Sequence, residues 1–161
     1  MISAENLVDG FGLSLRLIHM QTEGLSHADS LIQTPYNINC LNWVLGHIAV
    51  NRDNVLRLIG GEPVLSDNVY QSYVSGSDPI KEDGECVVQL EQLLELLGEG
   101  QARISDAVEK LSAEDLKKEI LVGDTKMPVI NRLFGFYFHD TYHTGQTELL
   151  RQISGMNDRI V

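Results

Sequence analysis

Apolar side chains recur at helical spacing in four stretches of the chain. The first stretch runs from about Ala4 to Gln21, and its apolar members lie at steps of four, four and three: Leu7, Phe11, Leu15 and Ile18. This spacing places them on one face of a helix, which Gly24 is suited to end. The second stretch begins near Asn39, a common N-cap residue, and stops at Gly60 and Gly61. Its apolar members are Leu41, Val44, Ile48, Val55 and Leu58.

The two later stretches have the same periodicity. The third alternates steps of three and four with one polar interruption, which is typical of a bundle seam: Val87, Leu90, Leu94, Leu97, Gln101, Ile104, Val108 and Leu111. The fourth opens with Pro128, a residue suited to a first helical turn, and continues to Ser154 before Gly155. No alternating run of strand length appears, so the sequence predicts an all-α four-helix bundle. The segment 112–115 resembles a capping box and predicts one further short helix.

The connector between the second and third helices is long and contains several turn residues. About 26 extended residues reach roughly 80 Å, well beyond the ~30 Å length of a twenty-residue helix. A long crossover is therefore possible, with helices two and three parallel and an up-down-down-up arrangement. A surface loop explains the length equally well, and loops of this length often cover binding sites.

Composition and charge narrow the function classes. The length of 161 residues and the 43% hydrophobic content fit a single soluble domain spanning residues 1–161. A net charge of -11 argues against nucleic acid and anionic membrane surfaces as partners. The N-terminus lacks the charge pattern of a signal peptide and no apolar run is long enough to span a membrane, so we expect a cytoplasmic protein. Cys40 and Cys86 are expected to be reduced thiols.

The fourth helix carries the most specific chemistry. Seven of its residues repeat at steps of four and three and are expected to point into the bundle: Arg132, Phe136, His139, His143, Gln146, Leu150 and Ile153. Burying the polar members costs about 1 to 3 kcal/mol each unless they find partners. His139 and His143 lie one turn apart, so their rings can converge on one ion.

A third ligand must come from another helix, and His47 is the best candidate. It lies about 60° around the second helix from Val44, at the edge of the apolar stripe. Three neutral imidazoles leave a coordination position open, as in catalytic rather than structural metal sites. Asp140 is expected to point away from this seam, and His19 and His27 to be solvated.

Four further residues are candidates for the surroundings of the metal. Gln146 or Asn51 is expected to hydrogen-bond a ligand ring and orient it. Trp43 and Tyr142 are candidates to line a pocket, although aromatic residues at such positions are more often core or interface residues.

The motif H-x3-H-x-G-Q, here His139 to Gln146, resembles that of the DinB-like bundle proteins, the DinB and YfiT superfamily. The segment Leu41-Asn-Trp43-Val-Leu-Gly-His47 is also similar, as is the region from Glu23 to Pro35. The resemblance implies a bundle with helices two and three parallel, zinc or nickel on His47, His139 and His143, and frequent homodimers. Thr144 departs from it, because many relatives carry a basic residue there.

Characterised members of this family include thiol-dependent S-transferases and a maleylpyruvate isomerase, and many others are labelled metal-dependent hydrolases. We therefore expect a metal-dependent enzyme that acts on a small molecule, with a metal-bound low-molecular-weight thiol as the nucleophile. Tyr70, Tyr73 and Ser77 of the long connector are candidates to cover its site. A hydrolase with metal-activated water is the first alternative, although no glutamate adjoins the ligands as a general base. The second alternative is a metal-binding dimer module without turnover.

Overall fold

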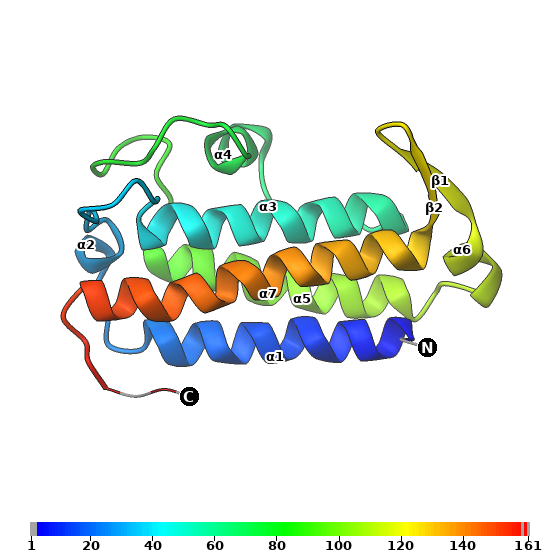
Figure 1. The fold of residues 1–161 in the computed structure, drawn as a ribbon, viewed down its shortest axis with the longest axis horizontal. Coiled ribbons are helices and arrows are strands. Elements are labelled where there is room, and N and C mark those ends of the chain that lie inside the picture. The colour runs from blue at the N-terminus through cyan, green and yellow to red at the C-terminus, as the bar shows by residue number, and fades with distance from the viewer. Residues whose placement is uncertain (1–2, 159, 161) are drawn as a thin grey trace.

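A computed structural model describes residues 3–158 and 160 of the chain. Its four long helices are α1 (Ala4–Thr22), α3 (Leu41–Ile59), α5 (Leu90–Val108) and α7 (Val129–Ile153). They lie side by side, with α3 and α5 running in one direction and α1 and α7 in the other (Figure 1). The predicted up-down-down-up bundle is therefore confirmed. No helix within the described residues is long and apolar enough to cross a membrane.

The helix ends follow the expected residue chemistry at most positions. The side chain of Ser3 accepts a hydrogen bond from the Asn6 N–H, and Gly60 adopts a left-handed conformation with φ of 75° after α3. One boundary was predicted wrongly, because Cys40 and not Asn39 is the N-cap of α3. Cys40 makes no side-chain capping bond, so the start of α3 depends on packing instead of capping: Cys40 and Leu41 are both buried.

The long connector between α3 and α5 is an ordered crossover that contains the short helix α4 (Asp67–Tyr73). The buried carboxylate of Asp53 accepts the backbone N–H groups of residues 64 and 65, at 2.8 and 3.1 Å. Tyr73 is completely buried, and burial raises its pKa to about 12, so its hydroxyl stays protonated. That hydroxyl donates to Asn42 of α3 and accepts the N–H of Val88, which fastens the crossover to the bundle.

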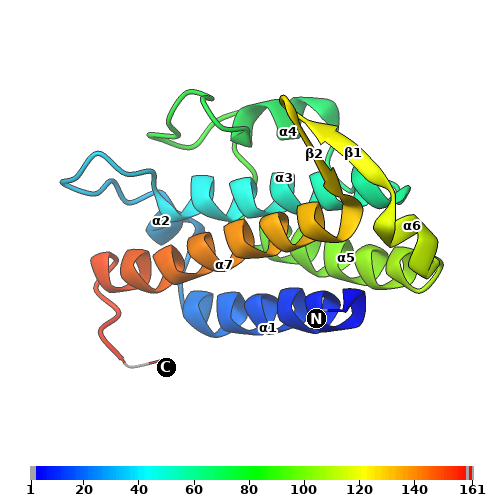
Figure 2. The same ribbon diagram turned by 45° about the vertical axis from the view of Figure 1, so that its right-hand side comes forward.

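Three shorter features complete the chain: α2 (His27–Ser30), α6 (Ala113–Lys117) and a hairpin of β1 (Glu119–Val122) and β2 (Thr125–Pro128). The capping box predicted at Ser112 is present at the start of α6. The hairpin was not predicted, since each strand has only four residues and little burial to produce an alternating pattern. It stands at the end of the bundle where α5 ends and α7 begins (Figure 2). Pro128 accordingly ends β2 and precedes α7 instead of lying in its first turn.

A buried ion pair joins the four long helices. Arg52 of α3 and Asp140 of α7 both have side chains with 0% exposure, and two guanidinium nitrogens lie 3.0 and 3.4 Å from the carboxylate oxygens. Arg52 also donates to the carbonyl groups of Leu97 in α5 and Phe11 in α1. The expectation that Asp140 points away from the interior was wrong.

The inward face of α7 is correspondingly rotated from the predicted one. Its buried positions are Val129, Leu133, Phe136, Asp140, Thr144, Thr147, Leu150 and Arg151. The histidines and Gln146 are only half-buried, because polar residues occupy both the interior and its edge and the apolar count alone could not separate them. His139 and His143 therefore lie at the rim of the bundle, where a small molecule can reach them.

Candidate metal centre

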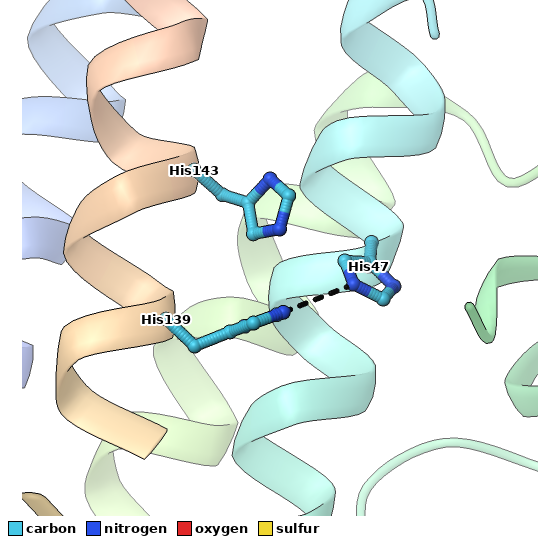
Figure 3. A group of neighbouring side chains, drawn as sticks. All are labelled: His47, His139 and His143. Atoms are coloured by element: carbon cyan, nitrogen blue, oxygen red, sulfur yellow. Dashed lines mark hydrogen bonds between the residues drawn. The ribbon is translucent and has the colours of Figure 1, made fainter. Parts of the chain in front are cut away.

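Three histidines from two helices meet at this rim. His47 projects from α3 toward His139 and His143, which project from α7 (Figure 3). One ring nitrogen of each histidine lies within 4.8 Å of the others, and the Nε2 atoms of His47 and His139 are 3.3 Å apart. Centroid separations of 4.5 to 5.0 Å show that all three rings are mutual neighbours. The structure thus brings together the ligand set expected from the sequence.

Hydrogen bonds fix the tautomers of two of the rings. Nδ1 of His47 lies 2.7 Å from the backbone oxygen of Tyr73, and a carbonyl oxygen only accepts, so this nitrogen carries the proton. Nδ1 of His143 lies 2.7 Å from Oε1 of Gln146, as expected for a residue that orients a ligand ring. In both rings Nε2 is therefore the atom with the lone pair, and that of His47 faces Nε2 of His139 at 3.3 Å.

All three imidazoles are neutral near pH 7. Burial lowers the pKa of His47, and it is also the main cause of the lowered pKa of His143. Burial lowers the pKa of His139 to about 4, and the nearby charges of His143, His47 and Arg132 act in the same direction. Neutral imidazole is the form that binds a transition metal.

This donor set fits a divalent ion of intermediate softness such as zinc or nickel. Two Nδ1–H groups are already engaged by oxygen acceptors, which is the usual arrangement behind metal-binding histidines. The Nδ1 atom of His139 is buried and has no hydrogen-bond partner among the described residues. Nε2 of His139 lies 3.3 Å from Nε2 of His47, so either the proton of neutral His139 or a cation lies between these two nitrogens.

One side of the centre opens into a hollow of about 430 Å³ with aromatic walls. Trp43 stacks on the His47 ring with a centroid distance of 4.6 Å, and its Nε1 donates to Oγ of Ser77. The exposed Tyr142 meets the His143 ring edge-on at 5.1 Å. Both aromatic residues border this hollow, although core or interface positions are the commoner ones for such residues.

A second hollow, of about 420 Å³, lies on the other side of the centre and shares His47 and His139 with the first. Tyr70 of the crossover helix lines it, as does Arg132. Asn51 also lines it, but its amide donates to the carbonyl of Phe136 and bonds none of the histidines. Asn51 therefore holds α7 against α3, and the ring-orienting role falls to Gln146.

The crossover was expected to cover the site with the side chains of Tyr70, Tyr73 and Ser77, but Tyr73 contacts the histidines in another way. The Tyr73 ring is packed against α3 beneath the crossover, and only its carbonyl reaches His47. Gly46 makes this packing possible, because a Cβ atom there would lie 2.0 Å from Cδ1 of the Tyr73 ring. The glycine directly before His47 was the sequence signal for this close approach, and sequence reasoning missed it.

Sequence reasoning also missed His27, which is half-buried instead of solvated. Its Nδ1 accepts the N–H of Leu90 at the start of α5, and its Nε2 lies 3.3 Å from Asp83.

His19 is exposed on α1, as expected. Cys40 is a buried free thiol and Cys86 an exposed one.

Fold and site together define an up-down-down-up helical bundle with a three-histidine cluster between two of its helices. The family model of the DinB superfamily matches residues 21–147, which is more than half of the chain, so the protein belongs to this superfamily. A crystal structure of a conserved protein from Enterococcus faecalis is similar in fold, with a TM-score of 0.75 over 96% of this chain and 98% of that one. The two sequences are 16% identical, so this likeness concerns the fold alone. No curated protein matches the chain.

Proposed function

We propose that the protein binds one divalent ion, zinc or nickel, through His47, His139 and His143 and uses it to transfer a low-molecular-weight thiol to an electrophilic carbon. The observation that carries the proposal is the convergence of three neutral imidazoles between two hollows, with Nδ1 of two of them held by an oxygen acceptor so that Nε2 has the lone pair. Three protein ligands leave a coordination position for an exogenous group.

The bound ion would supply the positive charge that keeps a thiol deprotonated at neutral pH. In the transfer, the sulfur forms a bond to carbon, the leaving group departs with its electron pair, and the thiol proton passes to solvent. The protein's own residues hold the reactants: Trp43 and Tyr142 offer flat apolar walls on one side of the centre.

The lining of the two hollows favours thiol transfer over hydrolysis. None of the described residues that line either hollow is Asp or Glu. Metal-bound water usually needs such a carboxylate to accept its proton during attack on an ester or amide. A thiol has a reference pKa of about 8.5, so a nearby cation is enough to ionise it.

A conjugation assay tests the proposal. Wild type, His143→Ala and the control His19→Ala are supplied with zinc or nickel, a small thiol and 1-chloro-2,4-dinitrobenzene, and chloride release is measured. We expect turnover that needs both metal and thiol, is lost in His143→Ala and is unchanged in His19→Ala, because His19 is exposed on α1. Ester cleavage with metal and water alone would indicate a hydrolase instead, and metal binding without either reaction a module that does not turn over.

A homodimer is also proposed, in line with the family resemblance. Large apolar side chains are exposed on the adjacent helices α1 and α7, including Leu13, Met20, Phe134 and Phe138. Such side chains are typical of surfaces that bind another protein. Sedimentation equilibrium would give the mass of a dimer if this is right and of a monomer if it is wrong.

A further inference from the structure

Arg132 lies in the first turn of α7 and lines the hollow of about 420 Å³ together with His47 and His139. Its guanidinium carbon is 4.1 Å from the centroid of the Phe136 ring. This stacking uses the flat face of the guanidinium group and leaves the N–H groups at its edge free. The cation thus rests on the Phe136 ring in the hollow that His47 and His139 also line.

The N–H groups of Arg132 have no acceptor within the described residues. No carboxylate of residues 3–158 or 160 lies within 4.0 Å of it, and its side chain donates no hydrogen bond to them. Three other arginines, Arg52, Arg103 and Arg151, each pair with a carboxylate. In a chain with 23 acidic and 12 basic residues, an arginine without a carboxylate at the wall of a hollow stands out as available for a ligand.

We propose that Arg132 binds a carboxylate of the substrate while the other end of the molecule reaches the three-histidine centre. Arginine presents two parallel N–H donors whose geometry matches the two oxygens of a carboxylate. Phe136 supports the guanidinium group from one side. Asn51, Asn54 and Tyr70 also line this hollow, and none of its described lining residues is an acidic residue that competes for the cation.

The spacing along α7 bounds the length of this substrate from above, because the Arg132 side chain lies over Phe136, one turn nearer to His139. Arg132 and His139 are seven residues apart, which is two turns and about 10.5 Å along the axis of α7. The ligand is therefore an elongated small molecule with a carboxylate at one end and its reacting atom several bonds away. The inference that the other end of the ligand reacts at the three histidines rests on the proposed function. The inference that Arg132 binds its carboxylate does not.

Calorimetric titration of adipate and its uncharged analogue adipamide tests the subsite in both the zinc-loaded and the zinc-free protein. We expect wild type to bind adipate at least about ten-fold more tightly than adipamide, consistent with one charge-assisted bidentate contact. Arg132→Gln should remove this preference, and Arg132→Lys should keep part of it, since lysine offers charge without the paired donors. Arg16→Gln is the matched control, because it removes the same charge from an exposed position on α1.

A preference that is absent in wild type, or that persists in zinc-free Arg132→Gln, would overturn the subsite, since in the zinc-free protein the second carboxylate of adipate has no metal to bind. Far-ultraviolet circular dichroism and the melting temperature of Arg132→Gln check that the variant is folded. The titration separates the two proposals, because adipate binding in the zinc-free protein tests Arg132 even if thiol transfer fails. Conversely, thiol transfer without an adipate preference would overturn the subsite alone.

The carboxylate belongs either to the electrophile or to the thiol. Repeating the titration with 6-mercaptohexanoate and 6-mercaptohexanol distinguishes these sources. If wild type prefers 6-mercaptohexanoate over 6-mercaptohexanol and Arg132→Gln loses this preference, the carboxylate belongs to the thiol. A loss seen with adipate but not with this pair assigns it to the electrophile, and both results support the subsite.

Discussion

Replacing Asp140 with asparagine leaves the guanidinium group of Arg52 buried without its counter-charge. Both side chains have 0% exposure, and the carboxylate oxygens lie 3.0 and 3.4 Å from two guanidinium nitrogens. Breaking a buried pair in this way costs about 3 to 5 kcal/mol. Domains have a free energy of unfolding of about 5 to 15 kcal/mol, so a large share of the stability is lost. For a chain of this size, the melting temperature should fall by roughly 6 to 20 °C.

The double variant Arg52→Met with Asp140→Leu separates the cost of a buried, unpaired charge from the cost of the lost contacts between the two side chains. It removes both charges while keeping similar apolar volume, and we expect it to be more stable than Asp140→Asn alone. Urea unfolding of the zinc-free proteins, followed by circular dichroism, gives the three free energies. A loss below about 1 kcal/mol for Asp140→Asn, or a double variant less stable than the single one, would refute the reasoning.

Three further predictions concern the histidine cluster. Gly46→Ala should weaken zinc binding in a competition titration with a chelator. The added Cβ atom would displace the Tyr73 ring and with it the Tyr73 carbonyl, which orients the His47 ring. Unchanged zinc affinity would contradict this prediction. Gln146→Ala should weaken zinc binding by about 10- to 100-fold in the same titration, since Nδ1 of His143 loses its acceptor. The pKa of His139 is about 4 in the folded protein and near 6.5 when unfolded, so only the unfolded state takes up this proton between these values. The zinc-free protein should therefore lose up to about 3 kcal/mol of stability as the pH falls from 6.5 to 4, and His139→Gln should show a shallower loss in urea titrations at each pH.

Helical periodicity located the four long helices because each buries an apolar stripe against the others. The helix C-termini were predicted as well, because the glycines that follow them adopt positive φ angles: Gly24, Gly60 and Gly155. The β-hairpin was not predictable in the same way, because strands this short and exposed carry no alternating pattern. The start of α3 was misplaced by one residue for a related reason, since a buried cysteine takes the place of a capping side chain.

The candidate site was partly predictable. The spacing of His139 and His143 identified two members on one helix, and family resemblance together with the edge position of His47 supplied the third. The inward direction of Asp140 was missed because its partner Arg52 lies 88 residues away in the sequence, and only the fold brings the two charges together. The contact of the Tyr73 carbonyl with His47 was missed for a different reason: a backbone atom carries no sequence signal of its own, and Gly46 indicated only that some side chain packs closely there.

The central claim is that three histidines from two helices hold one metal ion, and the metal content of the purified protein tests it most directly. Elemental analysis would compare wild type, the three variants His47→Ala, His139→Ala and His143→Ala, and the control His19→Ala. We predict about one divalent ion per chain in wild type and in the control, and loss of most of it in each of the three variants while helical content is retained. Full metal content in any of the three variants, or a wild type that binds no zinc or nickel even when supplied with it, would contradict the account.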